Sequence, residues 1–394
     1  MRYSVIAAVA ASFVMAGAAA AEDVKIGVIF GYTGPLESIT PAMAAGAELA
    51  MKEVTDAGGI LDGRGVVSVR GDSTCVDAAA ATAAAERLIT SDGVAAIVGA
   101  DCSGVTTAIL QNVAMPNGVV MVSPSATSPA LSTIEDNGLF FRTSPSDARQ
   151  GEIASNILND RGVKEVAISY TNNDYGKGLA DFIERNFKES GGSVTISAPH
   201  EDGKADYSAE VGALAAAGGE VLVVVGYVDQ GGKGIIQAAL DSGAFETFYL
   251  PDGMVGDSLY AAIGDGVNGS YGSLPGSDSQ GAATFIELAE AAGFTSGAFA
   301  PESYDAAALI MLAMEAAGSA DSAAFAAKVM DLANAPGEQI MPGELAKALE
   351  LIRKGEDIDY VGASAVELVA PGESAGSYRE IEIKDGEITT ARFR

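Results

Sequence analysis

Histidine is almost missing from this sequence: His200 is the only one among 394 residues. A Ser-His-Asp or Cys-His relay needs a histidine that accepts the proton of its nucleophile, so any such relay would have to use His200. This residue lies in the polar run PHEDGKADY, which predicts a surface loop, and no nucleophile is near it in the sequence. Hydrolysis by a pair of carboxylates stays open, because acidic residues are abundant.

Basic residues are also scarce, since 23 lysines and arginines stand against 53 acidic residues. The resulting net charge of −30 argues against nucleic acid and against anionic membrane surfaces as partners. The acidic residues are scattered along the chain rather than grouped in blocks, which is typical of a solvated surface.

Long hydrophobic runs are absent after the first 21 residues. Arg2 precedes an apolar run at 5–15, and a tract of small residues ends at Ala21. This layout is that of a secretory signal peptide, which we expect to occupy residues 1–21 and to be cleaved after Ala21. Its apolar core is too short to span a bilayer, and no cysteine near the cleavage site offers a lipid anchor. The sequence therefore predicts a soluble protein exported to the periplasm.

Cysteine occurs only twice, at Cys75 and Cys102. Two thiols without supporting histidines are a poor set of zinc ligands, and a cysteine pair in an exported protein more often forms a disulfide. We therefore expect no metal site. A bond between the two sulfurs would hold the turn at 101–103 against the end of a predicted strand at 66–70.

Strand-like and helix-like segments alternate along most of the chain, which predicts βαβ units and mostly parallel sheets. The alternation pauses near 141–147 and then restarts, so we expect two similar α/β lobes, as the length also suggests. A mixed β-rich tail follows a helical region, which indicates that the chain crosses between the lobes more than once. We assign residues 22–143 and 273–362 to the first lobe, and residues 144–272 and 363–394 to the second.

The stretch GADCSGVTTA, residues 99–108, joins a predicted strand at 94–98 to a predicted helix that has Ser103 as its N-cap. The first N–H groups of a helix have no internal partner and the helix dipole is positive there, so this turn can bind a small carboxylate. Gly99 and Gly104 would let a ligand approach the backbone closely.

Polar groups also follow other predicted strands. Ligands bind at the carboxyl ends of strands in open parallel sheets, so we expect these turns to face a cleft between the two lobes. Asp252 follows a predicted strand at 247–250, where it could bind a ligand ammonium or, alternatively, cap its own turn. Tyr175 and Tyr227 lie on comparable turns, where they could contact a ligand or simply pack.

Two glycine-rich segments approach nucleotide-binding motifs without fitting them. Residues 264–269 match G-x-G-x-x-G, but a helix-like segment precedes them where a dinucleotide-binding fold has a strand. Residues 226–234 lack the serine or threonine that follows the lysine of a phosphate loop, and Asp229 would repel phosphate. We therefore expect no cofactor.

Taken in order, several motifs resemble the periplasmic substrate-binding proteins of ABC transporters for branched-chain amino acids, the leucine/isoleucine/valine type. They are VKIGVIFGYTGPL at the start, AGGI at 57–60, DSTC and DCSG around the cysteines, SPSATSP, NDYGKGLA at 173–180, and LPDGM. The resemblance covers almost the whole chain after residue 21. It implies a type I periplasmic binding protein fold, in which two Rossmann-like lobes are joined by a three-strand hinge and hold the ligand between them.

The resemblance also implies roles for individual residues. The family disulfide joins the cysteines that match Cys75 and Cys102. The serine after the second cysteine receives the ligand carboxylate, while a threonine and an acidic residue bind the ligand ammonium. The corresponding ligand-binding positions in this chain are Ser103, Ser125, Ala126, Thr127, Tyr175, Tyr227 and Asp252.

The match weakens where the family binds the ligand side chain. An aromatic residue that the family often places after GPL corresponds here to about Ile39, and Asp101 puts an extra carboxylate beside the ligand turn. We include both residues among the expected ligand contacts. These departures leave open a more polar or differently shaped amino acid, an amide or a small aromatic acid.

From this resemblance we expect the solute-binding protein of an ABC importer, a monomer without catalytic residues. It would close its lobes on an amino acid or similar small carboxylate and deliver it to a permease in the inner membrane. One alternative is a ligand sensor of the same fold that acts on a signalling partner. A second alternative is a secreted hydrolase.

Overall fold

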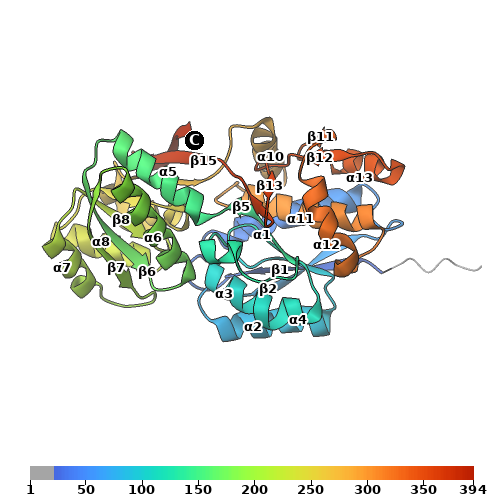
Figure 1. Cartoon of the computed structure of the whole chain (residues 1–394), viewed down its shortest axis with the longest axis horizontal. Coiled ribbons are helices and arrows are strands. Elements are labelled where there is room, and N and C mark those ends of the chain that lie inside the picture. The colour runs from blue at the N-terminus through green and yellow to red at the C-terminus, as the bar shows by residue number, and fades with distance from the viewer. Residues whose placement is uncertain (1–21) are drawn as a thin grey trace, which may run out of the picture.

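The computed structural model describes residues 22–394, so the expected signal peptide at 1–21 lies outside the described residues. Two α/β lobes lie side by side, and each is built on a seven-stranded sheet (Figure 1). This architecture is the two-lobed α/β fold that the alternating pattern predicted.

The first sheet consists of β1 (Val24–Phe30), β2 (Val66–Asp72), β3 (Ala96–Gly99), β4 (Met121–Ser123), β5 (Phe140–Pro145), β13 (Leu368–Val369) and β14 (Glu373–Ser374). Its spatial order is β13-β14-β5-β4-β3-β1-β2, and only β13 runs antiparallel to its neighbour. The central strand β1 pairs with both β2 and β3, so the turns after β1 and β3 flank the point where the strand order reverses.

The second sheet consists of β6 (Glu165–Thr171), β7 (Ser193–His200), β8 (Val221–Val225), β9 (Phe248–Leu250), β10 (Tyr271–Pro275), β15 (Tyr378–Lys384) and β16 (Glu387–Phe393). Its order is β16-β15-β10-β9-β8-β6-β7, with antiparallel pairing only at β15 and β16. Here the strand order reverses between β6 and β8. A third, two-stranded sheet pairs β11 (Glu338–Ile340) with β12 (Ile358–Tyr360).

Helices cover both faces of each large sheet, which explains why strands such as β3 and β8 are apolar and buried along their whole length. The α-helices are α1 (Thr40–Asp56), α2 (Ala78–Arg87), α3 (Ser103–Ile109), α4 (Met115–Asn117), α5 (Asp147–Asp160), α6 (Asp174–Glu189), α7 (Ser208–Ala217), α8 (Gly231–Ser242), α9 (Asp257–Ile263), α10 (Gln280–Ala291), α11 (Ala300–Ala317), α12 (Ser322–Leu332) and α13 (Leu345–Lys354). Short π-helices extend α2 and α3, at Leu88–Asp92 and Leu110–Ala114 respectively, and 3-10 turns lie at Pro129–Ser132, Asp252–Met254 and Gly264–Val267.

Helix α11 is buried along most of its length and is packed against α1, α12 and α13. A mainly apolar helix that is buried on most sides is typical of the centre of a large domain. Among residues 22–394, no single helix is long and apolar enough to cross a membrane, and only α11 with α12, bent by 115°, meets that criterion as a pair.

The chain crosses between the two sheets three times. It leaves the first sheet between β5 and α5, and it returns between β10 and α10. The last crossing lies at 375–377, because β13 and β14 still pair in the first sheet. We had assigned all of 363–394 to the second lobe; β13 and β14, with only two residues each, are too short to give a periodic signal.

His200 differs from its expected position in a surface loop. It ends strand β7 and is buried, with its Nδ1 atom 2.8 Å from the hydroxyl oxygen of Ser169. Burial lowers the pKa of His200 to about 4, so its imidazole is neutral at pH 7. The prediction of a surface loop was wrong because it relied on the polar residues around His200. The last residue of a strand can point into the core even when the residues that follow it form a polar loop.

Cys75 and Cys102 form a disulfide that links the segment after β2 to the turn between β3 and α3. The cross-link joins residues 27 apart in the sequence. It therefore holds one of the turns at the carboxyl edge of the first sheet against its neighbour.

Removal of this cross-link should destabilise the chain. For Cys75→Ala with Cys102→Ala we expect the free energy of unfolding to fall by about 3 kcal/mol, because the unfolded chain regains the entropy of an open loop. Urea unfolding monitored by circular dichroism measures the change, and a reductant should destabilise only the parent protein. Equal unfolding midpoints for the two proteins without reductant would contradict the prediction.

Candidate functional site

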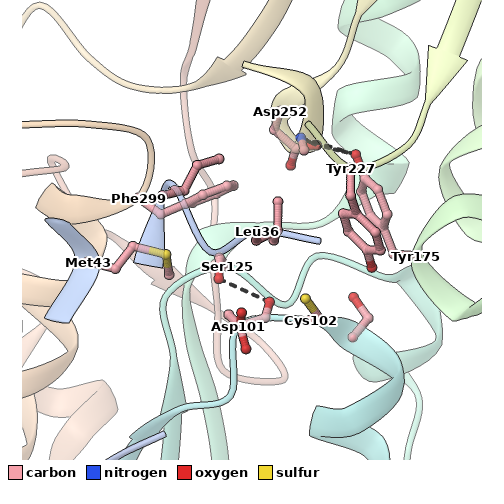
Figure 2. A pocket seen from close by; sticks show the side chains of 12 residues that line it. Leu36, Met43, Asp101, Cys102, Ser125, Tyr175, Tyr227, Asp252 and Phe299 are labelled. Atoms are coloured by element: carbon pink, nitrogen blue, oxygen red, sulfur yellow. Dashed lines mark hydrogen bonds between the residues drawn. The ribbon is translucent and has the colours of Figure 1, made fainter. Parts of the chain in front are cut away.

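A small cavity lies between the lobes, next to the carboxyl ends of strands from both sheets (Figure 2). Ser103, Ser125, Tyr175, Tyr227 and Asp252 line it, as the sequence had suggested for each of them. The first lobe provides the two serines, and the second lobe provides the tyrosines and Asp252. The two strand-order reversals thus bring the predicted polar residues to one place.

Ser103 lies at one end of the cavity but is not the N-cap of its helix. Cys102 holds the N-cap position, and Ser103 is the first residue of α3. The first bond within the helix runs from the Thr106 N–H to the Cys102 carbonyl oxygen at 3.0 Å, and helical geometry continues as far as Asn117. The N–H groups at 103–105 precede that bond, so they give this end of the cavity a positive potential.

The SPSATSP turn, residues 123–129 after β4, is held in place by a buried arginine that the sequence analysis missed. Arg142 on β5 is 1% exposed, and its Nη1 donates to the carbonyl oxygens of Ala126 and Ser128, at 2.9 Å each. Its Nη2 lies 2.5 Å from a carboxylate oxygen of Glu373 on β14. The arginine thereby joins the turn to the last strand pair of the first sheet.

Two residues of this turn differ in their relation to the cavity. Ser125 lines it, and its hydroxyl donates to the Asp101 carbonyl oxygen at 3.0 Å. Ala126 is not among the lining residues, and its N–H and carbonyl are already bonded to Ser123 and Arg142. The structure therefore places Ala126 behind the cavity wall.

Asp101 lines the cavity, but both of its carboxylate oxygens are bonded to other parts of the first lobe. Oδ2 accepts the Gly31 N–H at 3.0 Å, and Oδ1 accepts the Ser73 hydroxyl at 2.9 Å. Burial raises the pKa of Asp101, while these hydrogen bonds oppose the rise. Its carboxylate therefore joins the turns that follow β1 and β2, and its contact with a ligand stays a prediction.

Asp252 begins the turn after β9 and is 1% exposed. Its Oδ1 accepts the Tyr175 hydroxyl at 2.6 Å and the Gly253 N–H at 2.8 Å. Burial nevertheless raises its pKa to about 6, because a carboxylate with no cation beside it is poorly solvated.

Asp147, the first residue of α5, is a second buried carboxylate next to Asp252 that we did not predict. It is fully buried, and among the described residues neither of its oxygens has a hydrogen-bond partner. Burial and the charge of Asp252 raise its pKa well above the usual range, although the Thr127 hydroxyl and the charge of Arg142 lower it in part. Thr127 Oγ1 and Gln150 Oε1 are also buried without a partner. In the sequence, Ser146-Asp147 is indistinguishable from an ordinary helix start.

Apolar and aromatic groups complete the cavity. The rings of Tyr175 and Tyr227 stack with their centroids 5.4 Å apart, and Asn173 donates to the Tyr227 hydroxyl at 3.2 Å. Away from the tyrosines, the wall consists of the apolar side chains of Leu36, Ile39, Met43 and Phe299. Of these four, only Ile39 had been expected from the sequence.

The two lobes also contact each other directly at the rim of the cavity. The Asp229 carboxylate accepts the Ser38 N–H at 2.9 Å, and the Ser38 hydroxyl lies 3.1 Å from the Ser258 hydroxyl. A second contact is donated by the Ser128 hydroxyl to the Asp174 carbonyl oxygen at 3.1 Å. Because these bonds join the lobes, the structure represents a closed arrangement around the cavity.

Residues 23–343 match the profile of the periplasmic binding protein family. The chain belongs to this family. It is 33% identical over 328 residues to the Leu/Ile/Val-binding protein homolog 1 of Brucella abortus, covering 82% of this chain and 86% of that protein.

Solved structures of similar proteins show the same type I periplasmic binding protein fold. A leucine-binding protein from Thermotoga maritima has a TM-score of 0.79 at 24% identity, covering 94% of this chain and 98% of the other. A solute-binding protein of an ABC transporter from R. palustris, solved with benzoate, has a TM-score of 0.75 at 18% identity, covering 94% and 96%. The family and fold of this periplasmic binding protein are those of solute-binding proteins.

Arg142 provides a test of how the SPSATSP turn is supported. Arg142→Met should lower the free energy of unfolding by about 3–5 kcal/mol, because it leaves Glu373 and two carbonyl groups without their partner. Chemical unfolding measures this loss. Arg149→Met is the matched control, since Arg149 is exposed and pairs only with Glu152 three residues away. A similar small effect for both variants would contradict the prediction.

Proposed function

We propose that this chain is the extracytoplasmic solute-binding protein of an ABC importer, that it acts as a monomer, and that its ligand is an α-amino acid with an apolar side chain. The observation that carries the amino-acid assignment is the pair of buried carboxylates, Asp147 and Asp252. Asp252 lines the cavity, and Asp147 lies behind it with both oxygens unbonded among residues 22–394.

Two adjacent buried carboxylates are unfavourable unless a cation or a shared proton compensates them. The pKa values of both groups are raised, which is the expected response to the missing cation. A ligand ammonium bound at Asp252 would provide the positive charge in a site from which water is largely excluded. A carboxylic acid without an amine would leave the pair uncompensated.

The rest of the cavity fits the other parts of an α-amino acid. The Ser103 hydroxyl and the N–H groups at 103–105 suit the ligand carboxylate, opposite Asp252 across the cavity. The apolar wall of Leu36, Ile39, Met43 and Phe299 suits an aliphatic side chain and offers no polar group to a hydrophilic one. This feature favours an apolar amino acid over the amide that the sequence left open.

The comparisons support the amino-acid class in part. The Brucella relative is named for leucine, isoleucine and valine, and a relative from Pseudomonas aeruginosa at 29% identity is named for these with threonine and alanine. Other neighbours of this fold were solved with benzoate or 4-hydroxybenzoate. The buried carboxylate pair is our reason for preferring an amine-bearing ligand over an aromatic acid.

The test compares leucine with 4-methylpentanoate, which has the same carbon skeleton without the amine. We expect the parent protein to bind leucine or another apolar amino acid, and Asp252→Asn to weaken that binding by about 2–5 kcal/mol, as isothermal titration would measure. Asp147→Asn should weaken it less, because Asp147 does not line the cavity. The parent protein should bind the des-amino acid poorly.

Asp147→Asn should weaken amino-acid binding but stabilise the empty protein against unfolding. Asp147→Asn should raise its melting temperature, because the substitution removes a buried charge that has no partner. Asp181→Asn, which changes an exposed carboxylate on α6 paired with Lys177, is the control for general effects of losing a carboxylate. Stronger binding of 4-methylpentanoate than of leucine by the parent protein would refute the amino-acid assignment.

The carboxylate pair also predicts a pH dependence. The pKa of Asp252 is raised to about 6 in the folded empty protein, whereas an aspartate in the unfolded chain has a pKa of about 4. Between these two pH values the folded protein therefore binds a proton that the unfolded chain has released. Lowering the pH from 7.5 to 5 should therefore stabilise the empty protein against unfolding. The same change should weaken amino-acid binding, because a protonated Asp252 no longer attracts the ligand ammonium. Titrations at several pH values check the second effect, which should be reduced in Asp252→Asn.

A sensory role is a second candidate. The chain is 28% identical over 392 residues to a substrate-binding protein of a chemotactic signal transduction system from Halobacterium salinarum, covering 94% of this chain and 89% of that protein. Deletion of the gene in its own cell separates the two roles. Loss of labelled amino-acid uptake supports the importer, whereas loss of movement toward the amino acid with normal uptake supports the sensor.

A further inference from the structure

A second cavity, which we call the hinge cavity, opens along the boundary between the lobes. It is open to solvent on one side and is lined by Leu274, Arg379 and Phe393 of the second sheet and by Ile286, Glu290, Phe299 and Glu302 from the α10–α11 region. In Figure 1, α10 and β15 lie along the same edge of the molecule. Because Phe299 also lines the ligand cavity, its ring separates the two spaces.

The floor of the hinge cavity is a row of three side chains across the second sheet. Leu274 on β10 is the register partner of Arg379 on β15, and Arg379 is the partner of Phe393 on β16. Directly paired residues share one face of a sheet. The guanidinium therefore emerges between two apolar neighbours rather than among polar groups.

Arg379 has no ion-pair or hydrogen-bond partner among residues 22–394. Most of the described arginines form ion pairs in this acid-rich chain, for example Arg142 with Glu373 and Arg353 with Glu315. Burial lowers the pKa of Arg379, although an arginine keeps its charge at any physiological pH. The cavity thus contains a positive charge without a bound counterion from the protein.

Two acidic residues line this cavity: Glu290 on α10, which is exposed, and Glu302 near the start of α11. Neither forms an ion pair with Arg379 among the described residues. Glu302 is 2% exposed, and its carboxyl group bonds to no other side chain of the described chain. Burial raises its pKa to about 8, so at pH 7 it is mainly protonated and can donate a hydrogen bond. It therefore does not neutralise Arg379, and both groups remain able to bind a ligand.

The mouth of the hinge cavity exposes apolar surface. Ile286 and Phe393 are 49% and 37% exposed, and they belong to a very small set of large hydrophobic side chains on the described surface. Both line this cavity. An arginine without an ion-pair partner, flanked by exposed apolar groups, matches a molecule with an anionic head and an apolar body.

We propose that the hinge cavity is a second small-molecule site, which binds a monocarboxylate with an apolar body. The carboxylate pairs with Arg379 and accepts a hydrogen bond from Glu302, while the apolar body lies against Leu274, Ile286 and Phe393. This site does not depend on the identity of the ligand in the first cavity, and its walls come from both lobes.

Hexanoate is the probe, with hexylamine and hexanol as matched compounds of different charge. Ligand-observed NMR titrations of the chain from residue 22 should show hexanoate binding and no comparable binding of the amine or the alcohol. Arg379→Gln should weaken hexanoate binding by about tenfold or more, because it removes the only cation of the site. Arg149→Gln, which changes an exposed arginine elsewhere, should leave binding unchanged.

Further variants keep the proposal falsifiable if Arg379→Gln impairs folding. Ile286→Asp lies on the exposed mouth, is expected to fold, and should also weaken hexanoate binding. Glu302→Gln keeps a hydrogen-bond donor and should retain binding. Ser103→Ala alters the first cavity, so loss of hexanoate binding in this variant would place the probe there and overturn the proposal. Equal binding by the parent, Arg379→Gln and Ile286→Asp would also overturn it.

Discussion

The uncompensated charge of Asp147 and Asp252 is the constraint on which the rest of the structure depends. One carboxylate begins α5, directly after the first crossing between the lobes, and the other follows β9. A fold that only had to be stable would replace these groups by apolar ones, because a buried anion without a cation is costly. In the function that we propose, a ligand ammonium supplies the positive charge that these two carboxylates lack.

Other buried charged groups near the cleft are hydrogen-bonded through both of their polar ends, whereas Asp252 accepts its two hydrogen bonds through Oδ1 alone. Arg142 bonds to two carbonyl groups, the Ser132 hydroxyl and Glu373, and the Asp101 carboxylate accepts two hydrogen bonds. These two residues fix turns that belong to the first lobe. Phe299, which forms part of the apolar wall, is held in a left-handed conformation with φ +60° at the start of α11, a strained geometry that tends to occur at functional sites.

The sequence was sufficient for the architecture and for the residues at strand ends. The alternation of strands and helices predicted both lobes, and the turns after β3, β6, β8 and β9 held Ser103, Tyr175, Tyr227 and Asp252. The sequence did not show which distant residues come into contact where the chain crosses between the lobes. The pairing of Asp147 with Asp252, and of Arg142 with Glu373, joins residues more than one hundred positions apart and has no local pattern.

The two cavities are opposite in charge and share Phe299 as a wall. The first contains carboxylates without an ion-pair partner, whereas the hinge cavity contains an arginine without one among the described residues. They cannot compensate each other, because the apolar ring and the surrounding side chains keep them apart. Both cavities are bounded by residues of both lobes, so a ligand in either one stabilises a particular arrangement of the lobes. If the two ligands favour different arrangements of the lobes, binding of one ligand weakens binding of the other. The two ligands then change each other's affinity by the same factor.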